Sequence, residues 1–170
     1  MISTDRLIIK PLSLEELQWH STSPRDFARS MSVATSLTVI DTETKDAIDN
    51  VLLPNLAKNP DNPLFWTMWI IIDTSKMAII GAFCFHGAPD ENNEIEIGYG
   101  TDHIYRNQRY MTEAISAIVN WLKDNTNIRS IKAETDESNI ASVRLLTNNG
   151  FTRIGTNNAL AVFRLLLNSK

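Results

Sequence analysis

Residues 94–114 read EIEIGYGTDHIYRNQRYMTEA, and this stretch decides the fold. Glu94 to Thr101 alternates acidic and apolar residues with the period of two that is typical of a half-buried strand. From Tyr110 onward, apolar residues recur at helical spacing, at Ala114, Ile115, Ile118, Val119 and Leu122. A strand that passes through a short loop into a helix directs unpaired N–H groups and the positive end of the helix dipole at one point. The loop from Arg106 to Met111 is therefore predicted to suit phosphate, although on composition alone an ordinary strand-to-helix connection explains it as well.

The segments on either side extend this unit into a mixed sheet. Upstream, the apolar runs Phe65 to Ile72 and Met77 to Phe85 are joined by residues 73–76, whose composition suits a hairpin turn. With residues 94–101 these strands should form an antiparallel meander. Downstream, the pattern predicts a strand, a helix and two strands over Ile128 to Glu134, Asn139 to Asn148, Phe151 to Gly155 and Ala159 to Leu167. This order predicts an α/β (α+β) fold with helices on both faces of the sheet.

The predicted helix from Asn139 to Asn148 has clear boundaries. Asn139 makes a good N-cap for the N–H of Ser142, and Gly150 stands where a helix C′ residue is expected. Val143 and Leu146 should face inward. Taken alone, this segment is only a capped helix that returns the chain to the sheet.

The N-terminal part of the chain is predicted to begin with an edge strand and to continue in helices. The apolar run from Arg6 to Leu12 ends at Pro11 and reads as the edge strand. Helical patterns follow at Leu14 to His20, Pro24 to Met31 and Asp46 to Lys58. Ser13 and Ser23 are placed as N-caps, and Pro54 should break or kink the third helix.

Composition excludes several classes of protein. The 170 residues include 43% hydrophobic ones, which is enough for one ordinary domain with its own core. The only cysteine is Cys84, so an internal disulfide and a cysteine-based zinc site are excluded, and a reducing cytosol is the simplest location. The sequence shows neither a signal-peptide pattern nor an apolar stretch long enough for a membrane span. The net charge of −4 and the scattered basic residues argue against nucleic acid as a partner.

Four motifs in order carry a family resemblance. Thr4 to Leu12 looks like an opening strand, Glu96 to Tyr99 like a central-strand signature, and Tyr110 to Ala114 like a cofactor helix. The second motif of the same family is matched in register by Asn139, Ser142, Gly150 and Phe151. Together they resemble the GNAT superfamily of N-acetyltransferases, specifically the RimJ/RimL-like branch. The resemblance spans residues 1–170 and implies a single domain with a mixed, mostly antiparallel central sheet.

The resemblance also implies acetyl-CoA as cosubstrate. It would lie in a V-shaped split between the strand at Glu94 to Thr101 and the parallel strand at Ile128 to Glu134. The pantetheine would pair with backbone, the diphosphate would sit on loop N–H groups, and the thioester end would lie beside Asn139 and Ser142. The implied cofactor-binding residues are Tyr99, Gly100, Thr101, Arg106, Asn107, Gln108, Arg109, Tyr110, Met111, Thr112, Asn139 and Ser142.

The phosphate loop departs from the family pattern. The family normally has glycine at the positions of Asn107 and Arg109 and a small residue at Met111, because the backbone must approach the diphosphate closely. If Arg109 needs a positive φ, the penalty is on the order of 1 to 2 kcal/mol. Its guanidinium could instead hold the phosphates from outside. Two hypotheses follow: an enzyme that retains the cofactor site, or an inactive GNAT-fold binding or regulatory protein whose loop has degenerated.

Acetyl transfer to an amine needs a neutral amine and a stabilised leaving thiolate. Many relatives place a tyrosine acid at the position of Leu146, so Ser142 is the remaining hydroxyl candidate, against the alternative that it only decorates its helix. Glu96 is the candidate general base, against the alternative that Glu94 and Glu96 solvate an exposed strand face.

Several further residues have two readings. Trp19, Phe27 and Met31 lie in the helices that line the acceptor pocket of the family, but simple helix packing explains them too. His86 and His103 are expected to face solvent, and no metal site is predicted. The acceptor is expected to be a primary amine of a peptide, a protein N-terminus or a small molecule. The chain is expected to be a monomer or a homodimer.

Overall fold

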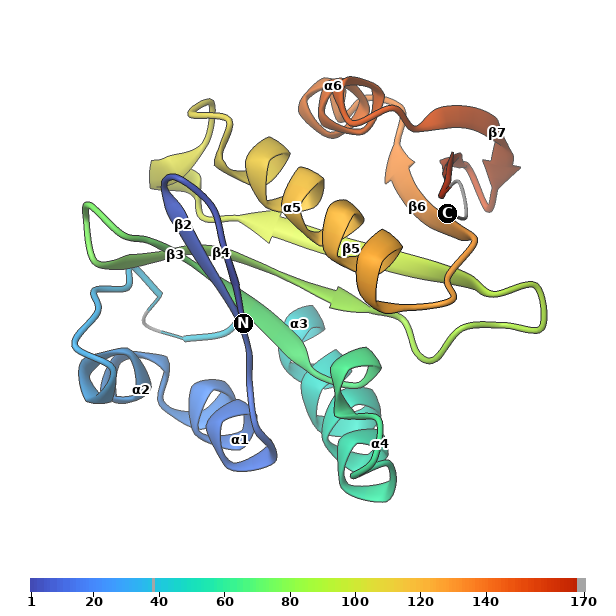
Figure 1. Ribbon diagram of the computed structural model, residues 1–170. Coiled ribbons are helices and arrows are strands. Elements are labelled where there is room, and N and C mark those ends of the chain that lie inside the picture. Colours follow the sequence, from blue (N-terminus) through green and yellow to red (C-terminus); the bar gives the residue numbers. More distant parts are fainter. Residues whose placement is uncertain (38, 168–170) are drawn as a thin grey trace.

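The computed structural model describes residues 1–37 and 39–167, which build one sheet with helices on both faces (Figure 1). In their order across the sheet, the strands are β1 (Ile2–Ser3), β2 (Leu7–Pro11), β3 (Met68–Asp73), β4 (Ala78–Phe85), β5 (Glu94–Thr101), β6 (Ser130–Asp136), β8 (Leu160–Leu166) and β7 (Thr152–Asn157). All neighbouring pairs are antiparallel except β5 and β6, which are parallel. The predicted meander and the mixed sheet are confirmed.

The helices form two groups. The N-terminal group consists of α1 (Leu14–Thr22), α2 (Pro24–Ser30), α3 (Thr42–Ala47), the π-helical η1 (Ile48–Leu52), α4 (Leu53–Lys58) and the 3-10 turn η2 (Pro63–Phe65). The C-terminal group consists of the 3-10 turn η3 (His103–Tyr105), α5 (Tyr110–Asn125) and α6 (Ile140–Asn148). In Figure 1, α1 to α4 lie on one side of the sheet, and α5 lies on the other.

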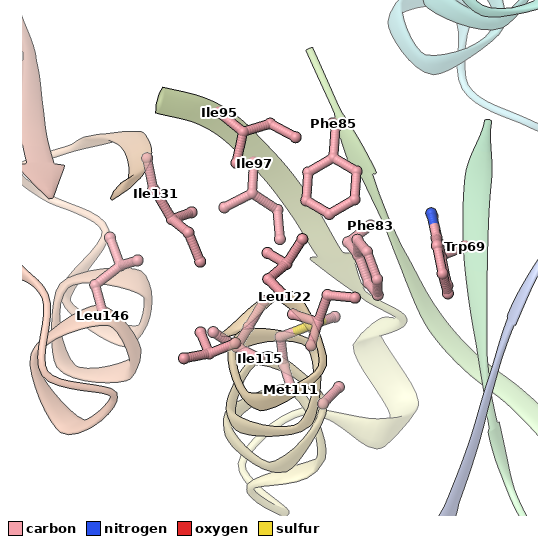
Figure 2. Close-up of a cluster of buried hydrophobic side chains, with 14 of the residues drawn as sticks. Trp69, Phe83, Phe85, Ile95, Ile97, Met111, Ile115, Leu122, Ile131 and Leu146 are labelled. Carbon is pink, nitrogen blue, oxygen red and sulfur yellow. The ribbon is translucent and has the colours of Figure 1, made fainter. Parts of the chain in front are cut away.

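Each face of the sheet carries its own hydrophobic core. The α5 face buries Phe83, Ile97, Ile115 and Leu122 in a cluster that also includes Leu146 from α6 (Figure 2). The opposite face packs α1 to α4 against β3 through residues such as Leu17, Phe27 and Ile70. The strand alternation of β5 directs Ile95 and Ile97 into the first cluster, as its period of two predicts.

Most predicted boundaries are confirmed to within a few residues. Ser13 caps α1 by accepting from the N–H of Glu16, and Asn139 caps α6 by accepting from the N–H of Ser142 at 3.2 Å. Gly150 has a φ of +82°, as a C′ residue requires. Ser23 occupies the N-cap position of α2, but its side chain makes no capping hydrogen bond.

The predictions for three segments need correction. The strand predicted from Phe65 begins at Met68, because Pro63 starts a 3-10 turn that the Trp66 N–H closes. The third helix begins at Thr42, because Asp41 caps it. Pro54 does not end this helix, since it stands in the first turn of α4, but the α-helical pattern is interrupted directly before it by the π-helical segment Ile48–Leu52. The predictions also lacked β1, which is too short to show a period.

Within residues 1–37 and 39–167, no helix is long and apolar enough to cross a membrane. The same part of the chain has no cluster of three or more histidine, cysteine, aspartate or glutamate residues that could hold a metal ion.

Candidate active site

The sheet opens between its two parallel strands. β5 and β6 pair only where Glu94, Ile95 and Glu96 face Ser130, Ile131 and Lys132. Beyond these pairs β5 continues to Thr101 and β6 to Asp136, and a cleft of about 760 Å³ lies between them and the first turns of α5 and α6. This cleft is the V-shaped split that the sequence predicted.

The cleft gathers most of the predicted cofactor-binding residues. Its lining includes Tyr99, Gly100, Thr101, Arg106, Asn107, Arg109, Tyr110, Met111, Thr112, Asn139 and Ser142. Gln108 does not line it, and its side-chain amide donates to the Ile104 carbonyl at 3.4 Å instead. Arg144 of α6 also lines the cleft, a residue that sequence reasoning missed because its helix carries no local phosphate signal. Three arginines, Arg106, Arg109 and Arg144, are among the lining residues, which favours an anionic ligand, and Arg106 Nε also donates to the Thr101 carbonyl at 3.3 Å.

The loop before α5 has the backbone conformation of a glycine-rich loop without its glycines. Asn107 has a φ of 62° and Arg109 a φ of 61° with ψ of 14°, both in the left-handed region. For a residue such as arginine, this conformation costs about 1 to 2 kcal/mol. Arg109 is the N-cap of α5, and within the described chain its side chain makes no capping hydrogen bond. The first N–H groups of α5 have no intrahelical acceptor and can bind an anion.

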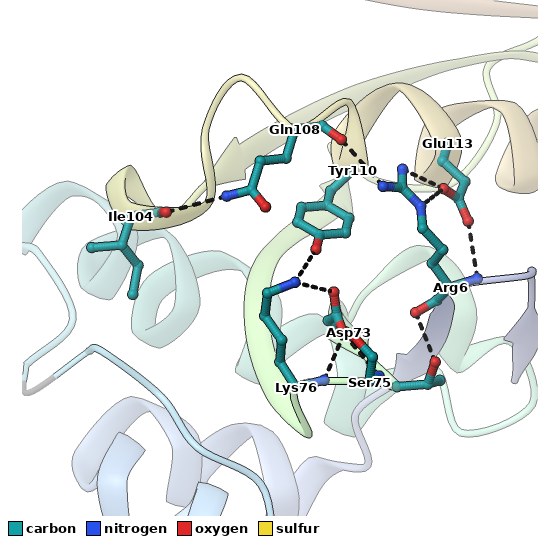
Figure 3. A network of polar contacts seen from close by, with 9 residues as sticks. Arg6, Asp73, Ser75, Lys76, Ile104, Gln108, Tyr110 and Glu113 are labelled. Carbon is teal, nitrogen blue, oxygen red and sulfur yellow. Dashed lines mark hydrogen bonds and ion pairs between the residues drawn. The ribbon is translucent and has the colours of Figure 1, made fainter.

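A polar network fixes the start of α5 (Figure 3). The Arg6 guanidinium lies 4.6 Å from the centre of the Tyr110 ring, and Lys76 Nζ donates to the Tyr110 hydroxyl at 2.5 Å. Lys76 Nζ also pairs with Asp73 at 3.1 Å, and Arg6 Nη2 pairs with Glu113 at 2.6 Å. Tyr110 is only 4% exposed, so its ring anchors the start of the helix in the protein. Tyr110 also lines the cleft, where its backbone can contact a ligand.

Met111 does not crowd the loop. Its side chain is 5% exposed and packs in the core beside Ile115 (Figure 2). The first turn of α5 directs this side chain inward, away from the loop.

Two hydroxyl groups meet in the cleft. The Tyr99 hydroxyl and Ser142 Oγ are 2.9 Å apart and link β5 to α6. Burial raises the pKa of Tyr99, and the hydrogen bond with Ser142 partly opposes that rise. Tyr99 is therefore a neutral hydroxyl at ordinary pH. The sequence predicts a role only for the backbone of Tyr99, since the pairing of its hydroxyl with Ser142 depends on how α6 lies against β5.

Glu96 lies on the other face of β5 and outside the cleft lining. Its Oε1 is 2.8 Å from His86 Nδ1 and its Oε2 is 2.7 Å from Lys132 Nζ. The hydrogen bond with His86, followed by the one with Lys132, lowers the pKa of Glu96 to about 2 against the opposing effect of burial. A carboxylate with so low a pKa stays ionised at neutral pH and is a weak proton acceptor.

Of the two aromatic residues in the early helices, Phe27 is buried and Trp19 is 44% exposed. Phe27 is 1% exposed in the core of the α1–α4 face, and the Trp19 ring lies 6.1 Å from it. Met31 packs against the same cluster. His103 is exposed as predicted, and His86 is exposed but paired with Glu96.

Comparisons with known proteins match most of the chain to one family. A family model described as "Acetyltransferase (GNAT) domain" matches residues 6–152. The uncharacterized N-acetyltransferase YjdG of Bacillus subtilis (strain 168) is 35% identical over 83 residues, and the match spans 49% of this chain and 49% of that protein.

Two solved structures show the same fold at low identity. The ribosomal-protein-S5-alanine acetyltransferase from Vibrio fischeri aligns with a TM-score of 0.71 at 13% identity, over 97% of this chain and 95% of that one. RimL, a ribosomal L7/L12 alpha-N-protein acetyltransferase in complex with coenzyme A, aligns with a TM-score of 0.68 at 15% identity, over 98% and 97% of the two chains.

Proposed function

The chain belongs to the GNAT acetyltransferase family, and we propose that it transfers an acetyl group from acetyl-CoA to a primary amine by direct attack of the amine on the thioester. One observation carries this proposal. The loop before α5 keeps the left-handed backbone at Asn107 and Arg109 although neither residue is glycine. A positive φ is costly for arginine, and a ligand bound at the mouth of the cleft would account for such a conformation.

The cleft residues divide into groups by their chemistry. The N–H groups at the start of α5 and the guanidinium groups of Arg106, Arg109 and Arg144 suit the phosphates of coenzyme A. From Ile97 to Thr101, β5 pairs with β4 but not with β6, so its edge on the β6 side offers backbone groups to the pantetheine amides. Coenzyme A would thus run from the start of α5 into the fork of the sheet.

The paired hydroxyls of Tyr99 and Ser142 are the proposed donors to the leaving thiolate. Both are neutral, and they are held together at 2.9 Å. Glu96 is the proposed carboxylate on the acceptor side. Because Glu96 stays ionised, it attracts and orients the ammonium group of the acceptor. Its low basicity makes water the better acceptor of the proton that this ammonium group must lose before it attacks.

The acceptor is a primary amine of a peptide, a protein N-terminus or a small molecule. The two structural neighbours above are named for action on ribosomal proteins, and a spermidine N-acetyltransferase from Vibrio cholerae shares the fold, so both peptide and polyamine acceptors are to be tested. The test is release of free coenzyme A in the presence of N-terminal peptides and of polyamines, with intact-mass detection of the acetylated product. Product from either class supports the transferase. Binding of acetyl-CoA without product from any amine would instead support an inactive binding or regulatory protein.

Ser142→Ala is expected to lower the turnover number by about ten- to a hundredfold with little change in acetyl-CoA affinity, because the hydroxyl stabilises charge that develops only during transfer. Steady-state kinetics with saturating acetyl-CoA measures this effect. Ser116→Ala, on the exposed side of α5, is the matched control and should leave turnover unchanged. An unchanged turnover number in Ser142→Ala would show that Ser142 only decorates its helix.

A further inference from the structure

The turn between β1 and β2 contains Thr4 and Arg6, which belong to the opening motif of the chain but do not line the cleft. The backbone of this turn is firmly held. The Thr4 N–H donates to the Leu7 carbonyl at 2.9 Å, and the Leu7 N–H donates to the Thr4 hydroxyl at 3.0 Å. The Arg6 carbonyl accepts from the N–H of Thr74 at 2.9 Å and from its hydroxyl at 3.1 Å. The Arg6 side chain therefore extends from a fixed point of the sheet.

The Arg6 guanidinium joins the first turn of α5 to the loop that precedes it (Figure 3). Its Nε donates to Glu113 Oε2 at 2.7 Å, and its Nη2 lies 2.6 Å from the same oxygen. Its Nη1 donates to the Gln108 carbonyl at 3.4 Å. Because the N–H groups of arginine form a rigid planar array, one side chain can serve both acceptors at once.

Gln108 stands between Asn107 and Arg109, the two left-handed residues of the loop. Its side-chain amide donates to the Ile104 carbonyl and its own carbonyl accepts from Arg6, so it is held at both ends. In a trans peptide unit, the carbonyl and the N–H of the next residue point in opposite directions. The Gln108 carbonyl points to Arg6, and the Arg109 N–H therefore points away from Arg6.

The charge of Arg6 is matched by Glu113. Burial raises the pKa of Glu113, but the hydrogen bonds from Thr4 and Arg6 outweigh this effect and lower the pKa, so the carboxylate is ionised. The Arg6 side chain is 45% exposed, and a partly exposed pair of this kind contributes little to stability. The fold should therefore tolerate substitution of Arg6, and the contact with Gln108 indicates a role in the loop.

We propose that Arg6 is a positioning residue of the phosphate loop, which holds the Gln108 carbonyl on the outer side and thereby directs the Arg109 N–H towards the diphosphate of coenzyme A. Asn107 and Arg109 line the cleft, whereas Arg6 does not, so Arg6 acts through the loop and does not touch the ligand. This inference rests on the proposed function, because it takes coenzyme A as the ligand of the cleft. It gives the opening motif a role in binding the cosubstrate.

Calorimetric titration with coenzyme A tests the proposal without any acceptor. Arg6→Met keeps an apolar stem but removes the donors to Glu113 and Gln108, and it is expected to raise the dissociation constant of coenzyme A by about tenfold. Arg6→Lys is expected to give a similar loss, because an ammonium group keeps the charge but cannot bridge both acceptors. A direct electrostatic effect on the phosphates would instead be restored by lysine.

Lys76→Met is the matched control. Lys76 Nζ also lies near Tyr110, 5.1 Å from the centre of its ring, but its carboxylate partner is Asp73. This variant should leave the affinity for coenzyme A unchanged to within about twofold, since it does not remove the contact with the loop carbonyl. Thermal unfolding of both variants without ligand separates a loss of stability from a loss of affinity. In steady-state kinetics, Arg6→Met should raise the KM for acetyl-CoA and leave turnover at saturation within about twofold of the original.

Three results would overturn the proposal. They are unchanged affinity in Arg6→Met, full affinity in Arg6→Lys, and an equal loss of affinity in Lys76→Met. If the original protein itself does not bind coenzyme A, the proposed function fails together with this inference. Binding by the original protein that Arg6→Met leaves unchanged contradicts this inference alone.

Discussion

Arg109→Gly is expected to weaken acetyl-CoA binding by about tenfold or more, because it removes a charge-assisted contact that is typically worth about 1.5 to 3 kcal/mol. The same substitution should leave the fold at least as stable, since glycine adopts the left-handed backbone of residue 109 without the penalty that arginine has there. Calorimetric titration measures the affinity, and urea unfolding measures the stability. A lower affinity for acetyl-CoA together with an unchanged or higher free energy of unfolding would indicate that Arg109 adopts a strained backbone and binds phosphate.

Asn107→Gly is the matched control for Arg109→Gly. It relieves the second left-handed residue of the loop without removing a charge, so binding should be unchanged or slightly tighter. Raising the ionic strength should also reduce the difference in acetyl-CoA affinity between the original protein and Arg109→Gly, because salt screens a charged contact. If Arg109→Gly instead binds acetyl-CoA more tightly, the Arg109 side chain obstructs the approach of the diphosphate to the loop backbone. That result would support a loop that has degenerated in a binding or regulatory protein.

Asp73→Ala is expected to lower the free energy of unfolding by about 1 to 3 kcal/mol, because it leaves hydrogen-bond donors without their acceptor, while the pair with the partly exposed Lys76 ammonium group adds little. Asp73 is 1% exposed and accepts hydrogen bonds from the backbone N–H groups of Ser75 and Lys76, each at 2.8 Å, and from the Ser75 hydroxyl at 2.7 Å. Its removal leaves these donors and the Lys76 ammonium group without their acceptor. Urea unfolding monitored by tryptophan fluorescence measures the loss.

Asp26→Ala provides the control for Asp73→Ala. Asp26 pairs with Arg29 on the surface, where both side chains are largely exposed, and such pairs contribute about 0 to 1 kcal/mol. A loss below about 1 kcal/mol in Asp73→Ala would show that the network in Figure 3 does not stabilise the fold.

Local periodicity predicted the elements that form the cleft. The alternation of β5 and the helical spacing of α5 are properties of neighbouring residues, so the sequence placed the loop between them correctly. The positive φ at Arg109 could be predicted from the family resemblance. The family has glycine at this position, and a residue that replaces it must adopt the same left-handed backbone. The parallel pairing of β5 and β6 followed from the order of the elements.

Contacts between distant elements could not be predicted in this way. The pairing of His86 with Glu96 depends on the register between β4 and β5, which no single strand pattern fixes. The meeting of Tyr99 with Ser142 depends on how α6 packs against β5. Arg144 reaches the cleft only because the sheet forks beside its helix. Local sequence patterns thus predict most of the backbone of the site, whereas the contacts of its side chains depend on tertiary packing.

The most direct measurement of the central claim is a calorimetric titration of the protein with acetyl-CoA, accompanied by thermal unfolding at the same ligand concentrations. Saturable binding is predicted, with a melting temperature that rises with ligand, since a ligand at a hundredfold its dissociation constant stabilises the folded state by about 2.7 kcal/mol. Absence of both binding heat and a shift in melting temperature at millimolar acetyl-CoA would contradict the claim that the cleft between β5 and β6 binds the cosubstrate.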